Sequence, residues 1–263
     1  MAFARVNGVV IHHGMRGRAD APAVVFSNSL GTDFRIWDDV VARLEDDFRI
    51  VLYDKRGHGL SEATPAPYSM TDHVDDLAAL LSHLGIVRTA VVGLSVGGMI
   101  AQGLAAARPG MVSGLVLCDT SHKIGTEQSW NARIETVTKA GIGSITDAIM
   151  KVWFTPEFRR PENAAFEGYK AMLSRQAVAG YAGTCAALRD CDLTESSRAL
   201  KLPVLCLVGD QDGSTPPDLV RSTADMIPGA RFEIIRDAGH IPCVEQPEET
   251  ARLIASFLGG LPA

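Results

Sequence analysis

Short apolar runs alternate with amphipathic stretches along most of the chain. The runs are rich in the β-branched residues that favour buried strands, whereas the stretches between them place apolar residues at helical spacing. The Asn7-Gly8 pair joins the first two runs and predicts a hairpin. We expect strands at residues 3–6, 9–13, 23–27, 49–53, 90–92, 115–118, 203–209 and 231–236.

The amphipathic stretches predict helices that connect these strands. Thr32 or Asp33 is suited to cap the first helix, Gly85 to end the second, and Pro247 to open the last. Such alternation predicts a mostly parallel sheet with helices on both faces, in which functional residues gather in the loops after the strands' carboxyl ends. We expect these helices at residues 36–44, 71–84, 99–107 and 248–258.

The alternation stops between residues 122 and 189. This stretch has no convincing strand, several helical patterns and seven of the 16 aromatic side chains of the chain. We interpret residues 122–189 as a helical cap inserted after the sixth strand, and residues 1–121 and 190–263 as the two parts of one core.

Composition and charge narrow the class of protein. The chain of 263 residues is 46% hydrophobic and 21% charged, which is ordinary for a globular protein with a sizeable core. A net charge of −6 disfavours nucleic acid and anionic membrane surfaces as partners. Five cysteines without a C-x-x-C pair, and a first segment unlike a signal peptide, favour a reduced, cytoplasmic protein.

One uncharged stretch, residues 90–107, is long enough to be weighed as a membrane span. Its four glycines and its change from strand-like to helix-like composition argue against that interpretation. Inside it, Gly93-Leu94-Ser95-Val96-Gly97 spells G-x-S-x-G between a predicted strand and a predicted helix, the context of a nucleophile elbow. Ser95 is therefore a candidate nucleophile, and the backbone N–H of Val96 a candidate donor to a developing oxyanion.

Two further loops offer the partners that such a serine needs. Asp237-Ala238-Gly239-His240 follows the strand at 231–236 and supplies His240 as a base, and the loop after 203–209 supplies Asp210 or Asp212 as the orienting acid. Ser, Asp and His in this chain order are typical of one fold class. Three other histidines are weaker candidates, because we expect no acidic partner near His12 and His13, and His58 lies in a polar, Gly-rich loop.

Taken together, the motifs resemble the α/β-hydrolase superfamily over essentially the whole chain. They are G-L-S-V-G-G at Ser95, D-x-R-G-H-G-x-S from Asp54, G-D-Q-D-G-S-T-P from Gly209, and the late G-H. The resemblance implies an α/β-hydrolase fold, Asp212 rather than Asp210 as the acid, and the backbone N–H of Leu30 as the second oxyanion donor beside that of Val96.

A narrower resemblance is to the 3-oxoadipate enol-lactonases. It rests on S-N-S-L-G-T-D before Trp37, on Trp153-Phe154-Thr155, and on Gly180-Tyr181 with Cys185. Asn28-Ser29 stands where many α/β-hydrolases have His-Gly, a change that leaves the amide donor in place. The resemblance implies a serine hydrolase, without metal or organic cofactor, that opens a carboxylated enol-lactone to 3-oxoadipate in aromatic-compound breakdown, the β-ketoadipate pathway.

Such a substrate carries a carboxylate, and an acidic protein needs a specific cation to bind it. Arg133 is the first choice because it follows Trp130 by three residues, so both would face one way on a helix, and Trp153 is a second candidate pocket wall. Arg133 on a solvated helix face is the competing interpretation. Other hypotheses are a general carboxylesterase, a carbon–carbon bond hydrolase, a cofactor-free perhydrolase, or a hydrolase-like ligand-binding protein without turnover. The oligomeric state stays open.

Overall fold

The computed structural model describes residues 1–261, which build one eight-stranded sheet in the order β1-β2-β4-β3-β5-β6-β7-β8. The hairpin β1–β2 pairs antiparallel with itself and with β4, and all later pairings are parallel. The α/β architecture expected from the sequence is confirmed. The strands are β1 (Ala2–Val6), β2 (Val9–Gly17), β3 (Ala23–Ser27), β4 (Arg49–Tyr53), β5 (Thr89–Leu94), β6 (Val112–Cys118), β7 (Val204–Gly209) and β8 (Arg231–Ile235).

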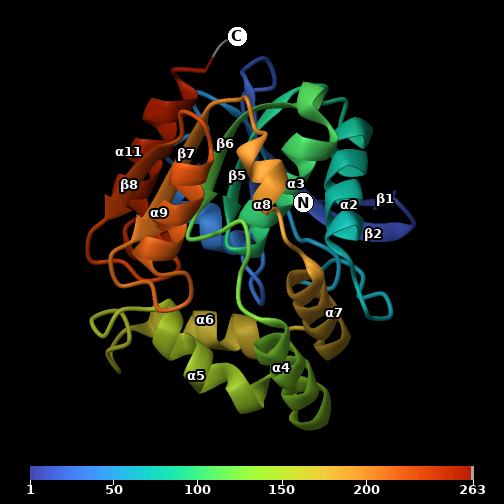
Figure 1. Ribbon diagram of the computed structural model, residues 1–263, viewed down its shortest axis with the longest axis vertical. Helices are drawn as coiled ribbons and strands as arrows, with labels where there is room; N and C mark the ends of the chain where they lie inside the picture. Colours follow the sequence, from blue (N-terminus) through green and yellow to red (C-terminus); the bar gives the residue numbers. More distant parts are fainter. Residues whose placement is uncertain (262–263) are drawn as a thin grey trace.

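Helices connect these strands and pack on the sheet. In Figure 1, α8 and α9 lie in front of the sheet, and α11 packs against α1. Within the described residues, no helix is both long and apolar enough to cross a membrane. The helices of this part of the chain are α1 (Asp38–Val41), α2 (Met70–His83), α3 (Val96–Ala107), α8 (Thr194–Arg198), α9 (Pro217–Met226), α10 (Pro242–Glu245) and α11 (Pro247–Leu258), with 3-10 turns η1 (Phe34–Trp37) and η2 (Pro109–Met111).

The first predicted helix, at residues 36–44, is wrong in detail. The structure has the 3-10 turn η1 followed by the short α1, and Asp33 caps the turn by accepting a hydrogen bond from Arg35 N at 3.1 Å. The apolar spacing was a sound guide to burial, because Trp37, Val40 and Leu44 are buried. The spacing could not reveal that the predicted helix begins with a 3-10 turn.

Between β6 and β7 the chain folds into a group of helices beyond the carboxyl ends of the strands (Figure 1). Helix α4 packs against α7, and α5 packs against both α4 and α6. One close approach to the sheet's loops is at Gly180, where an added Cβ would lie 2.0 Å from the carbonyl oxygen of Gly57. These helices are α4 (Glu127–Ala140), α5 (Gly143–Trp153), α6 (Ala164–Ser174) and α7 (Val178–Asp190).

The loop after β4 is fixed by buried ionic contacts. Arg56 binds Asp76 of α2 through two hydrogen bonds, of 2.5 Å from Nε and 2.6 Å from Nη2. Asp54 accepts hydrogen bonds from His12 Nδ1 at 2.7 Å, Phe34 N at 2.9 Å and Leu60 N at 2.9 Å. The loop is therefore a rigid base for the segments around it.

Candidate active site

Ser95 lies at the junction of β5 and α3 with φ of 57°, a left-handed conformation that non-glycine residues rarely adopt. The two flanking glycines make the turn possible. A Cβ at Gly93 would lie 2.3 Å from the oxygen of Gly97, and a Cβ at Gly97 would lie 2.1 Å from the oxygen of Ser27. The strand, sharp turn and helix expected from G-x-S-x-G are all present.

Asp212 and His240 meet across the loops that follow β7 and β8. His240 Nδ1 lies 2.9 Å from Asp212 Oδ2, and both side chains are buried. Burial pushes the pKa of Asp212 upward, but the attraction of His240 and several hydrogen bonds hold it below its ordinary value. One of those hydrogen bonds is donated by Thr215 Oγ1 to Asp212 Oδ2, at 2.6 Å. Asp210 instead accepts a long bond from Ala238 N at 3.4 Å, so the structure places Asp212 against the imidazole.

A cavity of about 240 Å³ joins Ser95 to His240. Within residues 1–261 no hydrogen bond forms between Ser95 Oγ and the imidazole, a looseness common in enzymes without bound substrate. Other predicted residues line the same cavity, namely Leu30, Trp130, Arg133 and Trp153, together with Tyr181, which was not predicted to do so.

The two candidate oxyanion donors are the backbone N–H groups of Leu30 and Val96. Val96 is the first residue of α3, where N–H groups have no partner within the helix and attract negative charge. Leu30 lines the cavity from the loop after β3. Among the described residues, neither N–H donates to a protein acceptor. Only Leu30 lines the cavity itself, whereas Val96 is fully buried directly behind Ser95.

Arg133 reaches the cavity from α4. Its guanidinium lies 5.1 Å from the centre of the Trp130 ring, whose Nε1 is fixed by a 2.7 Å bond to Ile124 O. In residues 1–261 no carboxylate lies within ion-pair distance of Arg133. Arg133 is half-buried, whereas the Tyr181 hydroxyl is buried and accepts no hydrogen bond that meets the usual distance within residues 1–261. Burial raises the pKa of Tyr181, and the neighbouring Arg133 partly opposes that rise. A cation without a carboxylate partner and a neighbouring hydroxyl thus face the same cavity.

None of the three weaker candidates, His12, His13 and His58, lines this cavity. The expectation that His12 has no acidic partner is wrong, because folding brings Asp54 to within 2.7 Å of its Nδ1. His58 is buried, and burial together with the nearby Lys55 lowers its pKa well below the usual value. Its Nδ1 lies 3.2 Å from Arg56 O, as expected for a residue that packs its own loop.

Asp119, directly after β6, is a site residue that sequence reasoning missed. It is fully buried with φ of 45°, and its Oδ1 accepts a 2.9 Å bond from Gly209 N. Asp119, Asp212 and His240 each bring a polar atom within 4.8 Å of the others. Burial, and then the charge of Asp212, raise the pKa of Asp119 well above the ordinary value, which favours its neutral form beside that carboxylate. Its position at a strand's carboxyl end was the available signal.

The carboxyl end of α5 holds the loop of His240. His240 N donates to Trp153 O at 2.7 Å, and Gly213 N, beside Asp212, donates to Val152 O at 3.3 Å. The rings of Trp153 and His240 are nearly parallel, with centroids 6.5 Å apart.

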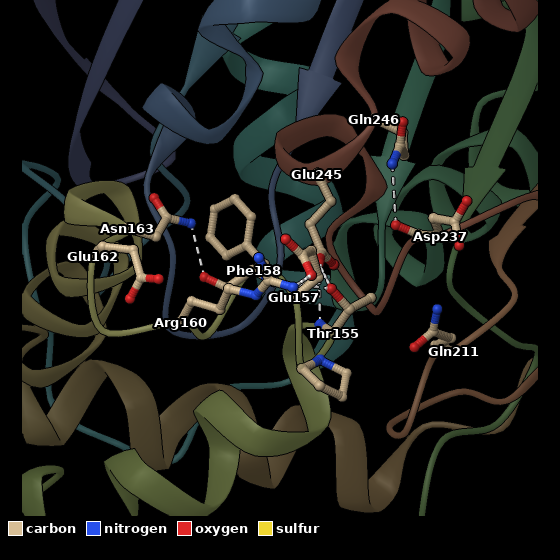
Figure 2. Close-up of a pocket in the computed structure, with 11 residues that line it drawn as sticks. Thr155, Glu157, Phe158, Arg160, Glu162, Asn163, Gln211, Asp237, Glu245 and Gln246 are labelled. Atoms are coloured by element: carbon tan, nitrogen blue, oxygen red, sulfur yellow. Dashed lines mark hydrogen bonds and ion pairs between the residues drawn. The ribbon is translucent and has the colours of Figure 1, made fainter.

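Glu245 of α10 adds a second link between these segments (Figure 2). Its Oε1 accepts hydrogen bonds from Thr155 N at 3.0 Å and Thr155 Oγ1 at 2.7 Å, while its Oε2 accepts one from Gly239 N at 2.7 Å. Burial nevertheless raises the pKa of Glu245. The adjoining cavity of about 700 Å³ has a lining distinct from that of Ser95 and His240.

Comparison with known proteins places these features in a wider group. The alpha/beta hydrolase family matches residues 9–253. The chain is 34% identical to 3-oxoadipate enol-lactonase 2 of Acinetobacter baylyi over 91% of this chain and 90% of that protein. The enol-lactonase of Burkholderia xenovorans LB400 superimposes with a TM-score of 0.95 at 33% identity, over 98% of this chain and 100% of that one. A thermophilic esterase of Thermogutta terrifontis, solved with malate bound, superimposes with a TM-score of 0.92 at 27% identity, over 98% of this chain and 97% of that one.

Proposed function

Because the chain belongs to the alpha/beta hydrolase family and is a hydrolase, we propose that it opens 3-oxoadipate enol-lactone to 3-oxoadipate in aromatic-compound breakdown. The single observation that carries the proposal is the cavity in which Ser95, the Asp212-bound His240 and the unpaired Arg133 meet. The enol-lactonases among its relatives support this substrate.

In the proposed first step, Ser95 Oγ attacks the lactone carbonyl carbon while His240 takes its proton. Asp212 holds the imidazole in the required tautomer and stabilises the cation that forms. The carbonyl electrons move to oxygen, and the N–H groups of Leu30 and Val96 bind that oxyanion. One such donor is worth on the order of 3 kcal/mol of transition-state stabilisation.

Collapse of the intermediate breaks the ring C–O bond. The leaving group is an enolate still tethered to the acyl chain. Protonation on carbon, with the proton that His240 took from Ser95, gives the ketone of 3-oxoadipate and restores the neutral imidazole. An enolate leaves more easily than an alkoxide, so the base role of His240 outweighs its acid role. Water, deprotonated by His240, then attacks the acyl-enzyme and releases the new carboxylate and Ser95.

Size and charge support a small anionic substrate. The cavity of about 240 Å³ is below the roughly 300–1,000 Å³ of pockets that bury drug-sized ligands. The substrate's free carboxylate would find the Arg133 guanidinium as its counter-ion, with Trp130 and Trp153 as walls. A long-chain ester would not fit this space without movement of the helices above it.

The experiment compares kcat/KM for the enol-lactone and for a neutral p-nitrophenyl ester, in the wild type and in Ser95→Ala. We expect a strong preference for the lactone that the variant abolishes. Arg133→Ala should raise KM for the lactone and leave the neutral ester unchanged, and equal effects on both substrates would reject the role of Arg133. If the wild type prefers the neutral ester and that activity depends on Ser95, the second candidate function, a general carboxylesterase, is supported instead. The similarity to the Thermogutta terrifontis esterase is the observation in favour of this second candidate.

A further inference from the structure

Lys55 carries a buried amino group that the proposed mechanism does not use. Directly after β4, it is 1% exposed, and its Nζ donates to Ser29 O at 2.6 Å and to Asn28 O at 3.3 Å. In residues 1–261 no carboxylate lies within ion-pair distance of this Nζ. Its two acceptors are therefore both carbonyls of the loop that leads to Leu30.

The burial of this side chain is unfavourable for stability. Lysine is almost never fully buried unless it is paired with a carboxylate. Burial lowers the pKa of Lys55 to about 7, and the negative charges of Asp54 and Asp33 only partly offset that effect. A well-packed apolar side chain of similar length would be better tolerated here. The contact with the loop is thus the benefit that distinguishes lysine from such a residue.

That contact fixes the orientation of one peptide group. Among the described residues only the Ala66–Pro67 bond is cis, so the Ser29–Leu30 peptide is trans, with its C=O and N–H pointing in opposite directions. Holding the Ser29 oxygen towards Lys55 turns the Leu30 N–H away from Lys55. Ser29 and Leu30 both line the cavity that contains Ser95.

A second side chain holds the same oxygen. Thr32 Oγ1 donates to Ser29 O at 3.0 Å, and Thr32 N lies 3.3 Å from it. The loop is closed further by Asn28, whose side-chain amide donates to Thr32 O. Ser29 O is therefore held from two sides, with the strong, short contact coming from Lys55.

We propose that Lys55 is a positioning residue of the oxyanion site, which binds the Ser29 carbonyl and so keeps the Leu30 N–H directed at the reacting oxygen. The inference rests on the proposed function, in which that N–H stabilises the oxyanion. A donor fixed before reaction needs no reorganisation when charge develops. Released from Lys55, the peptide can rotate and direct its carbonyl, rather than its N–H, towards the substrate.

The test is Lys55→Met, which keeps length and apolar bulk but removes the donor. With p-nitrophenyl acetate we expect kcat per active site to fall about 10- to 100-fold, below the roughly 100- to 1,000-fold typical of losing an oxyanion donor outright. KM should change less than about threefold, because the contact acts on the transition state. Inhibition by a trifluoromethyl ketone, whose Ser95 adduct carries an oxyanion, should weaken by a similar factor. The matched control is Lys201→Met, an exposed lysine without a contact to this loop.

Active sites are counted by fluorophosphonate labelling of Ser95, so loss of folded protein cannot imitate loss of kcat. Thr32→Val removes the other side-chain donor to Ser29 O at nearly constant volume. It should also lower kcat with little change in KM, but by a smaller factor. If Lys55→Met does not fold, Thr32→Val tests whether the hold on Ser29 O affects kcat, and an unchanged kcat then rejects the inference.

The outcomes separate the two proposals. If the wild type turns over neither the enol-lactone nor p-nitrophenyl acetate in a Ser95-dependent way, and Ser95 is not labelled, the proposed function is rejected, and the role of Lys55 with it. If the activity of the wild type depends on Ser95, but Lys55→Met and Thr32→Val leave kcat and the affinity for the trifluoromethyl ketone unchanged, the role of Lys55 alone is rejected. A lower melting temperature with unchanged kcat per labelled site assigns Lys55 to stability and also rejects the inference.

Discussion

The substitution Glu245→Gln should separate the positioning of His240 from the stability of the whole protein. The change keeps the shape of the side chain but replaces one acceptor oxygen by an NH₂ group. Thr155 offers two donors to one end of Glu245, and Gly239 offers one donor to the other. The amide oxygen should therefore keep Thr155, leaving the NH₂ group against the Gly239 N–H, directly before His240.

The magnitude follows from this one lost contact. A hydrogen bond to a charged group contributes about 1.5–3 kcal/mol, and about 1.4 kcal/mol corresponds to a tenfold change in rate. If the loss appears as displacement of His240, kcat falls by about 10- to 100-fold. Global stability should change little, because burial raises the pKa of Glu245 despite its three donors and the neutral amide avoids that desolvation.

The assay measures kcat, KM and melting temperature, with Ser95 titrated by a fluorophosphonate. The control is Glu162→Gln, an exposed carboxylate that lines the same cavity (Figure 2) without a contact to the His240 loop. We expect the control to match the wild type. A Glu245→Gln variant with wild-type kcat, or one that loses stability and activity in parallel, would refute this reasoning.

Three further predictions concern the stability of the fold and of the turn at Ser95. Asp76→Ala breaks the buried ion pair between the loop after β4 and α2, and should cost about 3–5 kcal/mol of unfolding free energy in urea, against less than about 1 kcal/mol for the part-exposed Asp75→Ala. Gly97→Ala should abolish Ser95 labelling, because its Cβ would lie 2.1 Å from a backbone oxygen, whereas Gly110→Ala, with no atom within 4 Å, should be neutral. Between its folded pKa of about 7 and its ordinary 10.5, the folded protein binds fewer protons at Lys55 than the unfolded chain does. The cost of burying it is complete below pH 7 and fades towards pH 10.5, so the stability of Lys55→Met relative to wild type should fall as the pH is raised from 7 to 10. A difference independent of pH would contradict this.

Local patterns were sufficient for most of the sheet. The β-branched runs of β3, β4 and β7 are fully or almost fully buried, and their periodicity and length leave little alternative to strands. The G-x-S-x-G turn was equally readable, because its geometry depends on glycines only two positions away. The first helix is the exception, because its 3-10 start is capped by a local contact between Asp33 and Arg35 that the apolar spacing did not indicate.

Contacts between distant segments could not be predicted in this way. His12 and Asp54 are 42 residues apart and Glu245 and Thr155 are 90 apart, so no spacing rule links them. Lys55 in a polar, Gly-rich loop looks like a solvated residue until β3 and β4 are placed side by side. Asp119 resembles an ordinary strand terminus until the loops of β6 and β7 converge.

The carboxyl end of α5 has a consequence for recombination between relatives. The last carbonyls of a helix usually bind water or a cap, but here those of Val152 and Trp153 bind the loops of Asp212 and His240. Helices α4–α7 are therefore not an exchangeable lid. A chimaera that takes them from a relative must preserve the backbone path from Val152 to Thr155. We expect variation among functional chimaeras to concentrate on the exposed faces of α4 and α6, because most of α7 is buried and Gly180 lies against Gly57.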